Sequence, residues 1–203
     1  MKYKLIVFDL DGVILDSKKN MQISWQNIKD RFDIKQSFDD YFEKIGRPFK
    51  MILDDLKIYN NQNLIEKLYF ESTISNEKHL KFYDGVFQTL QYLKKKNIKI
   101  SICTSKKLEN TLRILKKISI NFDSIVCPSE NLRGKPFPDQ LLQSINLVGM
   151  KNTDALYVGD TKIDQETAYN AKVKFVFAKY GYGKNENMVA DSIVKFSDII
   201  DFL

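Results

Sequence analysis

The sequence is poor in the residues that cross-link secreted proteins or bind transition metals. It contains two cysteines, Cys103 and Cys127, and one histidine, His79, in 203 residues. Two isolated cysteines provide neither a disulfide framework nor a paired metal-ligand spacing. Each adjoins a short apolar run, so we predict that both are small buried side chains. A single histidine excludes every mechanism and metal site that needs two.

Long apolar runs are also absent. No stretch approaches the roughly 18 consecutive apolar residues that a membrane span requires. The run at residues 5–8 is too short for the apolar region of a secretory signal, and acidic residues follow it directly. We therefore expect a cytoplasmic protein without a membrane partner.

Positive charge is in excess but is not concentrated. The net charge of +6 is the balance of 32 Lys and Arg against 26 Asp and Glu. A basic balance can indicate a nucleic-acid partner. Here the lysines are scattered, and the longest cluster, residues 94–96, ends a helix-like segment, where cations complement the helix dipole and stay solvated. We expect no nucleic-acid partner.

Short apolar runs alternate with helix-like segments in the C-terminal part of the chain. The runs suit strands that are buried on both faces of a parallel sheet. They lie at residues 4–8, 98–103, 124–127, 155–158 and 173–177. Helical spacing falls between them at residues 86–96, 108–118, 138–148 and 165–171. The alternation predicts an α/β fold with right-handed crossovers.

One connection is too long for a crossover. About 90 residues separate Asp9 from Ile98, whereas a crossover needs only about a dozen. The segment has helical apolar spacing, and a structureless loop of that length would be implausible. We therefore predict an inserted helical subdomain at residues 15–82 and a core made of residues 1–14 and 83–203.

The first candidate motif is Asp9-Leu10-Asp11-Gly12-Val13. Carboxylates two residues apart on extended chain point to the same side. Burying two like charges together requires a cation or a shared proton, and Mg²⁺ prefers oxygen ligands of this kind. A turn with helix-capping acids would produce the same pattern.

The second motif, Thr104-Ser105, directly follows the apolar run at residues 98–103. A hydroxyl and free N–H groups at a strand end bind phosphate oxygens, although a helix cap would use the same residues. The third motif, at residues 134–139, contains Lys135 between Gly134 and two prolines. The prolines stiffen the backbone and would fix one ammonium group near developing anionic charge, or simply form a rigid turn.

The fourth motif contains Asp160 and Asp164, just after the run at residues 155–158. If a helical turn follows the strand, residues four apart share a face, so both acids would approach one cation. The alternative is an acidic loop that caps the helix at residues 165–171. In open α/β sheets the carboxyl ends of the strands are where ligands bind, and all four motifs fall there.

Taken in order, DxDG, a threonine after a strand, Lys-Pro-x-Pro-Asp and GDTxxD resemble the motifs of the haloacid dehalogenase superfamily. The insertion resembles the helical-cap branch. Four short motifs are similar to phosphoglycolate phosphatase-like members: Gly46-Arg47-Pro48, Asp84-Gly85-Val86, Gly181-Tyr182-Gly183 and Ala190-Asp191-Ser192-Ile193. The likeness extends from Asp9 to about Leu203. It implies a Rossmann-like parallel-sheet core with an inserted α-helical cap.

The resemblance also implies catalytic roles in a Mg²⁺-dependent phosphatase that acts on a small phosphorylated metabolite. Asp9 would attack phosphorus and become an aspartyl-phosphate. Asp11 would protonate the leaving alcohol and then deprotonate the hydrolytic water. Thr104 would hold a phosphoryl oxygen, and Lys135 would neutralise the nucleophile and the phosphoryl group.

Binding roles follow from the same resemblance. The N–H groups of Leu10 and Ser105 would assist Thr104 with the phosphoryl oxygens, and Arg47 would reach into the site from the cap. Mg²⁺ would be held by the Asp9 carboxylate, the backbone carbonyl oxygen of Asp11 and the Asp160 carboxylate. Asp164 would support the ion through a water molecule.

Alternative functions remain open at this point. Dehalogenases of the superfamily lack an acid at the position of Asp11, because displacing halide needs no proton, so dehalogenation is not expected. Val13 stands where many relatives have Thr, and Val also occurs in hexose-phosphate mutases, which leaves a sugar phosphomutase as an alternative. A non-catalytic phosphometabolite-binding protein is the third possibility. Phosphoglycolate, sugar phosphates, nucleotides and pyrophosphate all suit the resemblance, and we expect a monomer or homodimer.

Overall fold

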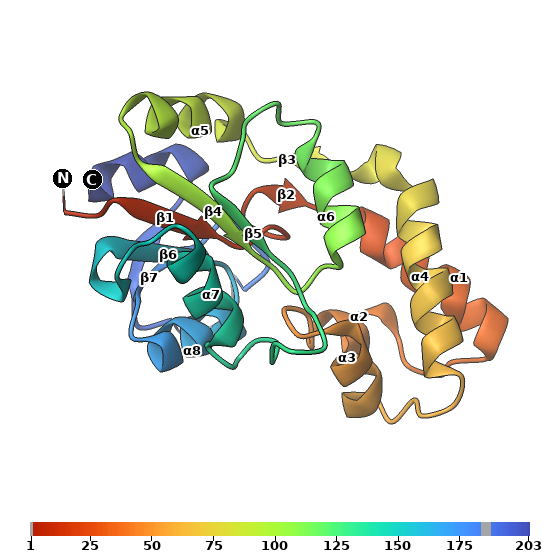
Figure 1. The fold of residues 1–203 in the computed structure, drawn as a ribbon. Coiled ribbons are helices and arrows are strands. Elements are labelled where there is room, and N and C mark those ends of the chain that lie inside the picture. The colour runs from red at the N-terminus through yellow and green to blue at the C-terminus, as the bar shows by residue number, and fades with distance from the viewer. Residues whose placement is uncertain (1, 184–187) are drawn as a thin grey trace.

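A six-stranded parallel sheet forms the centre of the core (Figure 1). The computed structural model describes residues 2–183 and 188–203. Along the sheet the order is β5-β4-β1-β6-β7-β8. The strands are β1 (Leu5–Phe8), β4 (Lys99–Cys103), β5 (Ser124–Val126), β6 (Ala155–Gly159), β7 (Lys174–Ala178) and β8 (Asp191–Ile193). The predicted α/β parallel-sheet fold is confirmed.

Helices cover both faces of this sheet. On one face lie α5 (Val86–Lys95) and the 3₁₀ helix η3 (Phe196–Phe202), and on the other lie α7 (Asp139–Leu147) and α8 (Lys162–Ala171) (Figure 1). A short 3₁₀ helix, η2 (Asn152–Asp154), precedes β6, and α6 (Leu108–Leu115) follows β4. The layers explain why the strand sequences are continuously apolar.

Strand β1 shows how the continuous run is used. Ile6 and Phe8 are buried in the cluster that includes α5 and η3, whereas Leu5 and Val7 are buried in the cluster that includes α7 and α8. Successive side chains of a strand point to opposite faces. Each such side chain contributes about 1.5–3 kcal/mol when fully buried, so both faces of the central strand hold the sheet to its helices.

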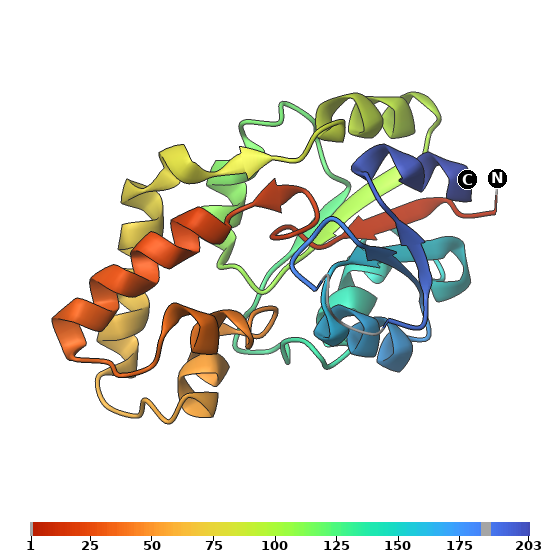
Figure 2. The same ribbon diagram turned by 180° about the vertical axis from the view of Figure 1, so that it is seen from behind.

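The segment between β1 and β4 forms a second helical body. It contains α1 (Lys18–Phe32), α2 (Phe38–Phe42), α3 (Phe49–Asp55), α4 (Gln62–Ser75) and the 3₁₀ helix η1 (Glu77–His79). These helices have an apolar cluster of their own, centred on Trp25, Leu53 and Tyr69. We call them the cap. A short antiparallel ribbon of β2 (Leu15–Asp16) and β3 (Lys81–Phe82) connects the cap to the core (Figure 2).

Several boundaries differ from those predicted. Helix α8 begins at Lys162 rather than at residue 165, and β8 was not predicted as a strand. Cys103 and Cys127 are free and buried, as predicted. Among the described residues, no helix combines the length and apolar composition needed to cross a bilayer.

The cap cluster provides a stability prediction. Trp25 is fully buried and stacks on Tyr41 with ring centroids 4.5 Å apart. Trp25→Ala should lower the free energy of unfolding by about 3–5 kcal/mol, because it leaves a cavity as well as losing apolar burial. Tyr59→Ala is the control, since Tyr59 is 68% exposed and its loss should cost no more than about 0.5 kcal/mol. Urea denaturation measures both; equal midpoints would show that Trp25 does not stabilise the cap.

Candidate active site

The polar residues of the first, second and fourth motifs follow three neighbouring strands. Asp9 follows β1, Thr104 follows β4 and Asp160 follows β6, and β1 lies between the other two in the sheet. Their carboxyl ends therefore meet at one edge. The chain order reverses on either side of β1, which is the topological position where open α/β sheets bind ligands. Lys135 reaches the same edge from the loop between β5 and α7.

Lys135 is the buried counter-charge of this edge. Its side chain is fully buried, with Nζ 2.9 Å from Asp9 Oδ1 and 2.7 Å from Asp164 Oδ1. Burial alone would lower the pKa of Lys135, but the Asp164 and Asp9 carboxylates outweigh it and raise this pKa above its usual value. Burial raises the pKa of Asp9 to about 7, against the lowering effect of Lys135. The lysine therefore remains charged between two carboxylates.

Asp164 is fully engaged in holding other groups. Its Oδ1 accepts hydrogen bonds from Lys135 Nζ and from the Tyr157 hydroxyl, each at 2.7 Å. Its Oδ2 accepts from the Thr161 hydroxyl at 2.7 Å and from the N–H groups of Thr161 and Asp160. Burial would raise the pKa of Asp164, but Lys135 and these hydrogen bonds lower it overall.

This arrangement corrects the expected geometry of the fourth motif. Thr161 is the N-cap of α8 and Asp164 is its third residue, and the two form a reciprocal capping box. Asp160 therefore precedes the helix and does not share a helical face with Asp164. The two acids still approach each other, because the Asp164 side chain folds back toward the strand end.

Asp160 lies in a confined position beside two glycines. A Cβ atom on Gly12, whose φ is +82°, would lie 2.0 Å from Asp160 Oδ2, and one on Gly181 would lie 2.4 Å from Asp160 Cβ. Asp160 Oδ2 accepts a 2.6 Å hydrogen bond from the Tyr182 N–H. Asp160 Oδ1 is buried and accepts no hydrogen bond from the described residues.

The Asp160 environment suits a cation. Burial, together with the Asp164 and Asp9 charges, raises the pKa of Asp160 well above its usual value. Oxygens of Asp9, Asp160 and Asp164 lie within 4.8 Å of one another. An orphaned buried carboxylate oxygen next to further carboxylates is costly unless positive charge is added. A hard divalent ion with oxygen ligands fits this donor set.

Asp11 has a different set of partners. Ser17 Oγ donates to Asp11 Oδ1 at 2.5 Å, and Lys106 Nζ lies 3.2 Å from Asp11 Oδ2. Ser17 is the N-cap of α1, and its N–H donates to the Tyr182 hydroxyl at 2.7 Å. Asp11 is therefore held where the core meets the cap, and its partners differ from those of Asp9 and Asp164, which both contact Lys135.

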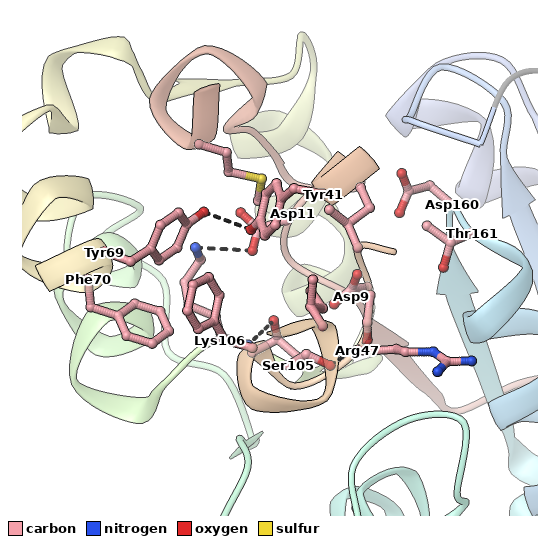
Figure 3. Close-up of a pocket in the computed structure, with 16 residues that line it drawn as sticks. Asp9, Asp11, Tyr41, Arg47, Tyr69, Phe70, Ser105, Lys106, Asp160 and Thr161 are labelled. Carbon is pink, nitrogen blue, oxygen red and sulfur yellow. Dashed lines mark hydrogen bonds and ion pairs between the residues drawn. The ribbon is translucent and has the colours of Figure 1, made fainter. Parts of the chain in front are cut away.

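A cavity of about 60 Å³ lies between the core and the cap (Figure 3). Asp9, Asp11, Thr104, Ser105 and Asp160 line its core side. The cap side is mostly apolar and aromatic, and consists of Met21, Tyr41, Ile45, Gly46, Arg47, Phe49, Ile52, Tyr69 and Phe70. Leu10 was predicted to bind a phosphoryl oxygen through its N–H. Its side chain is fully buried in the core cluster that includes α5 and η3.

Arg47 and Ser105 lie together at the edge of this cavity. Ser105 Oγ donates to the Gly46 carbonyl at 2.5 Å, so a core side chain holds the cap loop that contains Arg47. The Arg47 guanidinium donates to Asp55 at 2.8 Å and points away from Asp11 (Figure 3). Arg47 thus lines the cavity, while its charge is directed to a carboxylate of the cap.

Three residues at the site were not predicted from the sequence. Lys106 lines the cavity. Ser17 donates a hydrogen bond to Asp11, and the Tyr182 N–H donates one to Asp160. Lys106 adjoins the Thr104-Ser105 motif, and Tyr182 lies in the Gly181-Tyr182-Gly183 segment, so each was next to a recognised pattern. Neither pattern shows which way the side chain points.

The chain is similar to known proteins over nearly its whole length. The model of the family "Haloacid dehalogenase-like hydrolase" matches residues 6–178. The phosphoglycolate phosphatase of Aquifex aeolicus strain VF5 is 28% identical over 208 residues, which cover 98% of this chain and 96% of that protein. The β-phosphoglucomutase of Bacillus subtilis strain 168 is 27% identical over 207 residues, covering 95% and 89%. A solved structure from Lactobacillus plantarum has the same fold, with a TM-score of 0.90 at 20% identity and full coverage of both chains.

The role of Asp164 can be tested through stability. Asp164→Ala would leave the buried Lys135 with one carboxylate and would remove the capping box of α8. We expect the free energy of unfolding to fall by about 3–5 kcal/mol, the usual cost of breaking a buried ion pair from one side. Glu71→Ala is the control, because Glu71 pairs with Lys67 on α4 where both side chains are more than half exposed. Equal urea midpoints for the two variants would contradict the proposed role.

Proposed function

Because this chain belongs to the haloacid dehalogenase-like hydrolase family, we propose that it is a Mg²⁺-dependent phosphatase. It hydrolyses a small phosphorylated metabolite through an aspartyl-phosphate on Asp9. One observation supports this above all. The Asp9 carboxylate lines a cavity, with the buried Lys135 ammonium 2.9 Å from it and the orphaned Asp160 oxygen close by.

In the proposed reaction, an Asp9 oxygen attacks phosphorus and the bond to the leaving oxygen breaks. The leaving alkoxide takes the proton of Asp11. Water then attacks the aspartyl-phosphate and gives its proton to Asp11, which releases phosphate and restores Asp9. Lys135 offsets the repulsion between the carboxylate and the phosphate dianion. The Thr104 hydroxyl, with the N–H groups of Leu10 and Ser105, holds the phosphoryl oxygens.

The metal ligands in this proposal are Asp9, the Asp11 carbonyl oxygen and Asp160, with Asp164 in support through water. Bound Mg²⁺ supplies positive charge against the phosphate dianion. The contacts of Asp164 support an additional, positioning role. Its Oδ1 accepts a hydrogen bond from Lys135, and its Oδ2 accepts one from the Thr161 hydroxyl. Asp164 thereby orients the lysine and the loop that contains Asp160.

The cap and its cavity support a small substrate. A space of about 60 Å³ bordered by cap side chains accommodates a small phosphate ester far more readily than a phosphoprotein or nucleic acid. Closure of the cap over the core would exclude bulk water from the reacting phosphate. Phosphoglycolate is the default candidate, by analogy with the relative named phosphoglycolate phosphatase.

The nucleophile can be tested directly. Asp9→Asn should reduce Mg²⁺-dependent phosphate release from p-nitrophenyl phosphate by roughly 10⁴-fold or more, because the amide is a poor nucleophile and covalent catalysis is lost. Asp33→Asn, on the exposed surface, is the control. Activity retained in Asp9→Asn would rule out the mechanism. Conversion of one sugar phosphate into another without phosphate release would identify the phosphomutase alternative instead.

The metal site can be tested without measuring activity. Saturating Mg²⁺ at about 100 times its Kd should stabilise the wild-type protein by about 2.7 kcal/mol relative to an EDTA-treated sample. Asp160→Asn should lose most of this stabilisation, because one anionic ligand is removed. Thermal melts with Mg²⁺ and with EDTA measure the effect. An equal rise in Tm for both proteins would exclude Asp160 as a ligand.

A further inference from the structure

Lys106 is a cation of the cavity to which the proposed reaction assigns no role. It lies between Ser105 and the start of α6, and its N–H donates to Thr104 Oγ1 at 3.2 Å. Its side chain is only 9% exposed, with Nζ 3.2 Å from Asp11 Oδ2. Figure 3 shows the ammonium pointing toward Asp11, close to Tyr69. Lys106 is therefore placed beside the group that would protonate the leaving oxygen.

The other cations near the site have different duties. The Lys135 ammonium is shared between Asp9 and Asp164, which lie deeper in the core. The Arg47 guanidinium pairs with Asp55 of the cap and is directed away from Asp11. Among the described residues that line the cavity, Lys106 is thus the one cation directed toward Asp11.

The surrounding cap wall is poor in polar groups. Met21, Phe49, Ile52 and Phe70 are apolar. The two phenols of the wall, Tyr41 and Tyr69, are hydrogen-bonded to each other at 2.7 Å. A sugar with many hydroxyls would lose hydrogen bonds to water on entering such a wall and recover few of them. A short leaving group with one anionic end has few hydroxyls, so it would lose few hydrogen bonds to water against this wall.

An anion next to Lys106 would be bound strongly. An ammonium has three N–H donors, and Asp11 is the one carboxylate that pairs with Lys106 among the described residues. In a cavity with apolar walls, attraction between opposite charges is much stronger than in water, and charge-assisted hydrogen bonds are the stronger class.

We propose that Lys106 is a specificity-determining residue that binds a second anionic group on the leaving part of the substrate. That group is a carboxylate or a phosphate, close to the phosphoester oxygen because the cavity is small. The inference rests on the proposed phosphatase function and adds to it the chemical class of the substrate. It assigns Lys106 to recognition, and leaves the phosphoryl group to Lys135.

The test compares small substrates with and without this second charge. 2-Phosphoglycolate and 2-hydroxyethyl phosphate have the same two-carbon skeleton, with a carboxylate in one and a neutral alcohol in the other. Pyrophosphate is the arm with a second phosphate. For the wild-type protein we expect kcat/KM for at least one anionic substrate to exceed that for 2-hydroxyethyl phosphate by at least tenfold. The substrate with the higher kcat/KM shows whether the second anionic group is a carboxylate or a phosphate.

Variants at residue 106 then show whether the lysine is responsible. Lys106→Met should lower the anionic-to-neutral ratio of kcat/KM at least tenfold, mainly through KM, and Lys106→Arg should retain most of the ratio. Lys106→Gln, which keeps a polar side chain, replaces the methionine variant if that protein does not fold. Lys117→Met is the matched control, because Lys117 is about half exposed and pairs with Glu77 of η1, and neither residue lines the cavity. Its ratio should stay at the wild-type value.

Each contrary result has a definite meaning. A wild-type ratio near one, or an equal loss on charged and neutral substrates in Lys106→Met, would overturn the role of Lys106. Hydrolysis of p-nitrophenyl phosphate together with rejection of both anionic substrates would also overturn it, while leaving the phosphatase function in place. Failure to release phosphate from any of these substrates would instead reject the proposed function.

Discussion

Crowding of carboxylates around one buried ammonium is the constraint on which the rest of this site depends. Asp9 and Asp164 both contact Lys135, and an oxygen of Asp160 lies within 4.8 Å of oxygens of the other two acids. Buried like charges of this number are stable only when each is paired, hydrogen-bonded or bound to a cation. Most features of the core edge can be understood as ways to meet that requirement.

The features that meet this requirement come from ordinary local structure. At the start of α8, Asp164 Oδ2 accepts three hydrogen bonds, two from Thr161 and one from the Asp160 N–H. The Tyr157 hydroxyl on β6 donates one to Asp164 Oδ1. The absence of side chains at Gly12 and Gly181 leaves room for Asp160. Asp160 Oδ1 stays buried without a donor among the described residues, which is costly for a carboxylate oxygen unless positive charge is added beside it.

The cap contributes a surface of opposite character. Its wall is aromatic and aliphatic, and its link to the core passes through Ser17 and Tyr182, which also reach Asp11 and Asp160. The Tyr182 ring packs against Phe42 of the cap, with ring centroids 5.1 Å apart. The position of the cap and the positions of two acidic side chains thus depend on the same contacts.

Much of this architecture was predictable because its signals are local or follow from chain topology. The continuous apolar run of β1 required burial on both faces, and the motifs at Asp9, Thr104 and Asp160 had to meet because parallel strands end at one edge. The start of α8 was predicted three residues late, because an acid four residues after Asp160 suits a helix face and a capping box equally well. Only the hydrogen bonds of Asp164 distinguish these two arrangements.

The sequence by itself therefore determined the parallel α/β core and the edge where the motif residues gather, since both depend on periodicity and strand order. Only the tertiary structure decided the partners of each charge: Arg47 with Asp55, Lys106 with Asp11, and Asp164 with Lys135. The physical reason is that ion pairs depend on distances of a few ångströms. In the last two of these pairs the partners are far apart in the chain, and the packing of the cap and the loops on the core sets their separation.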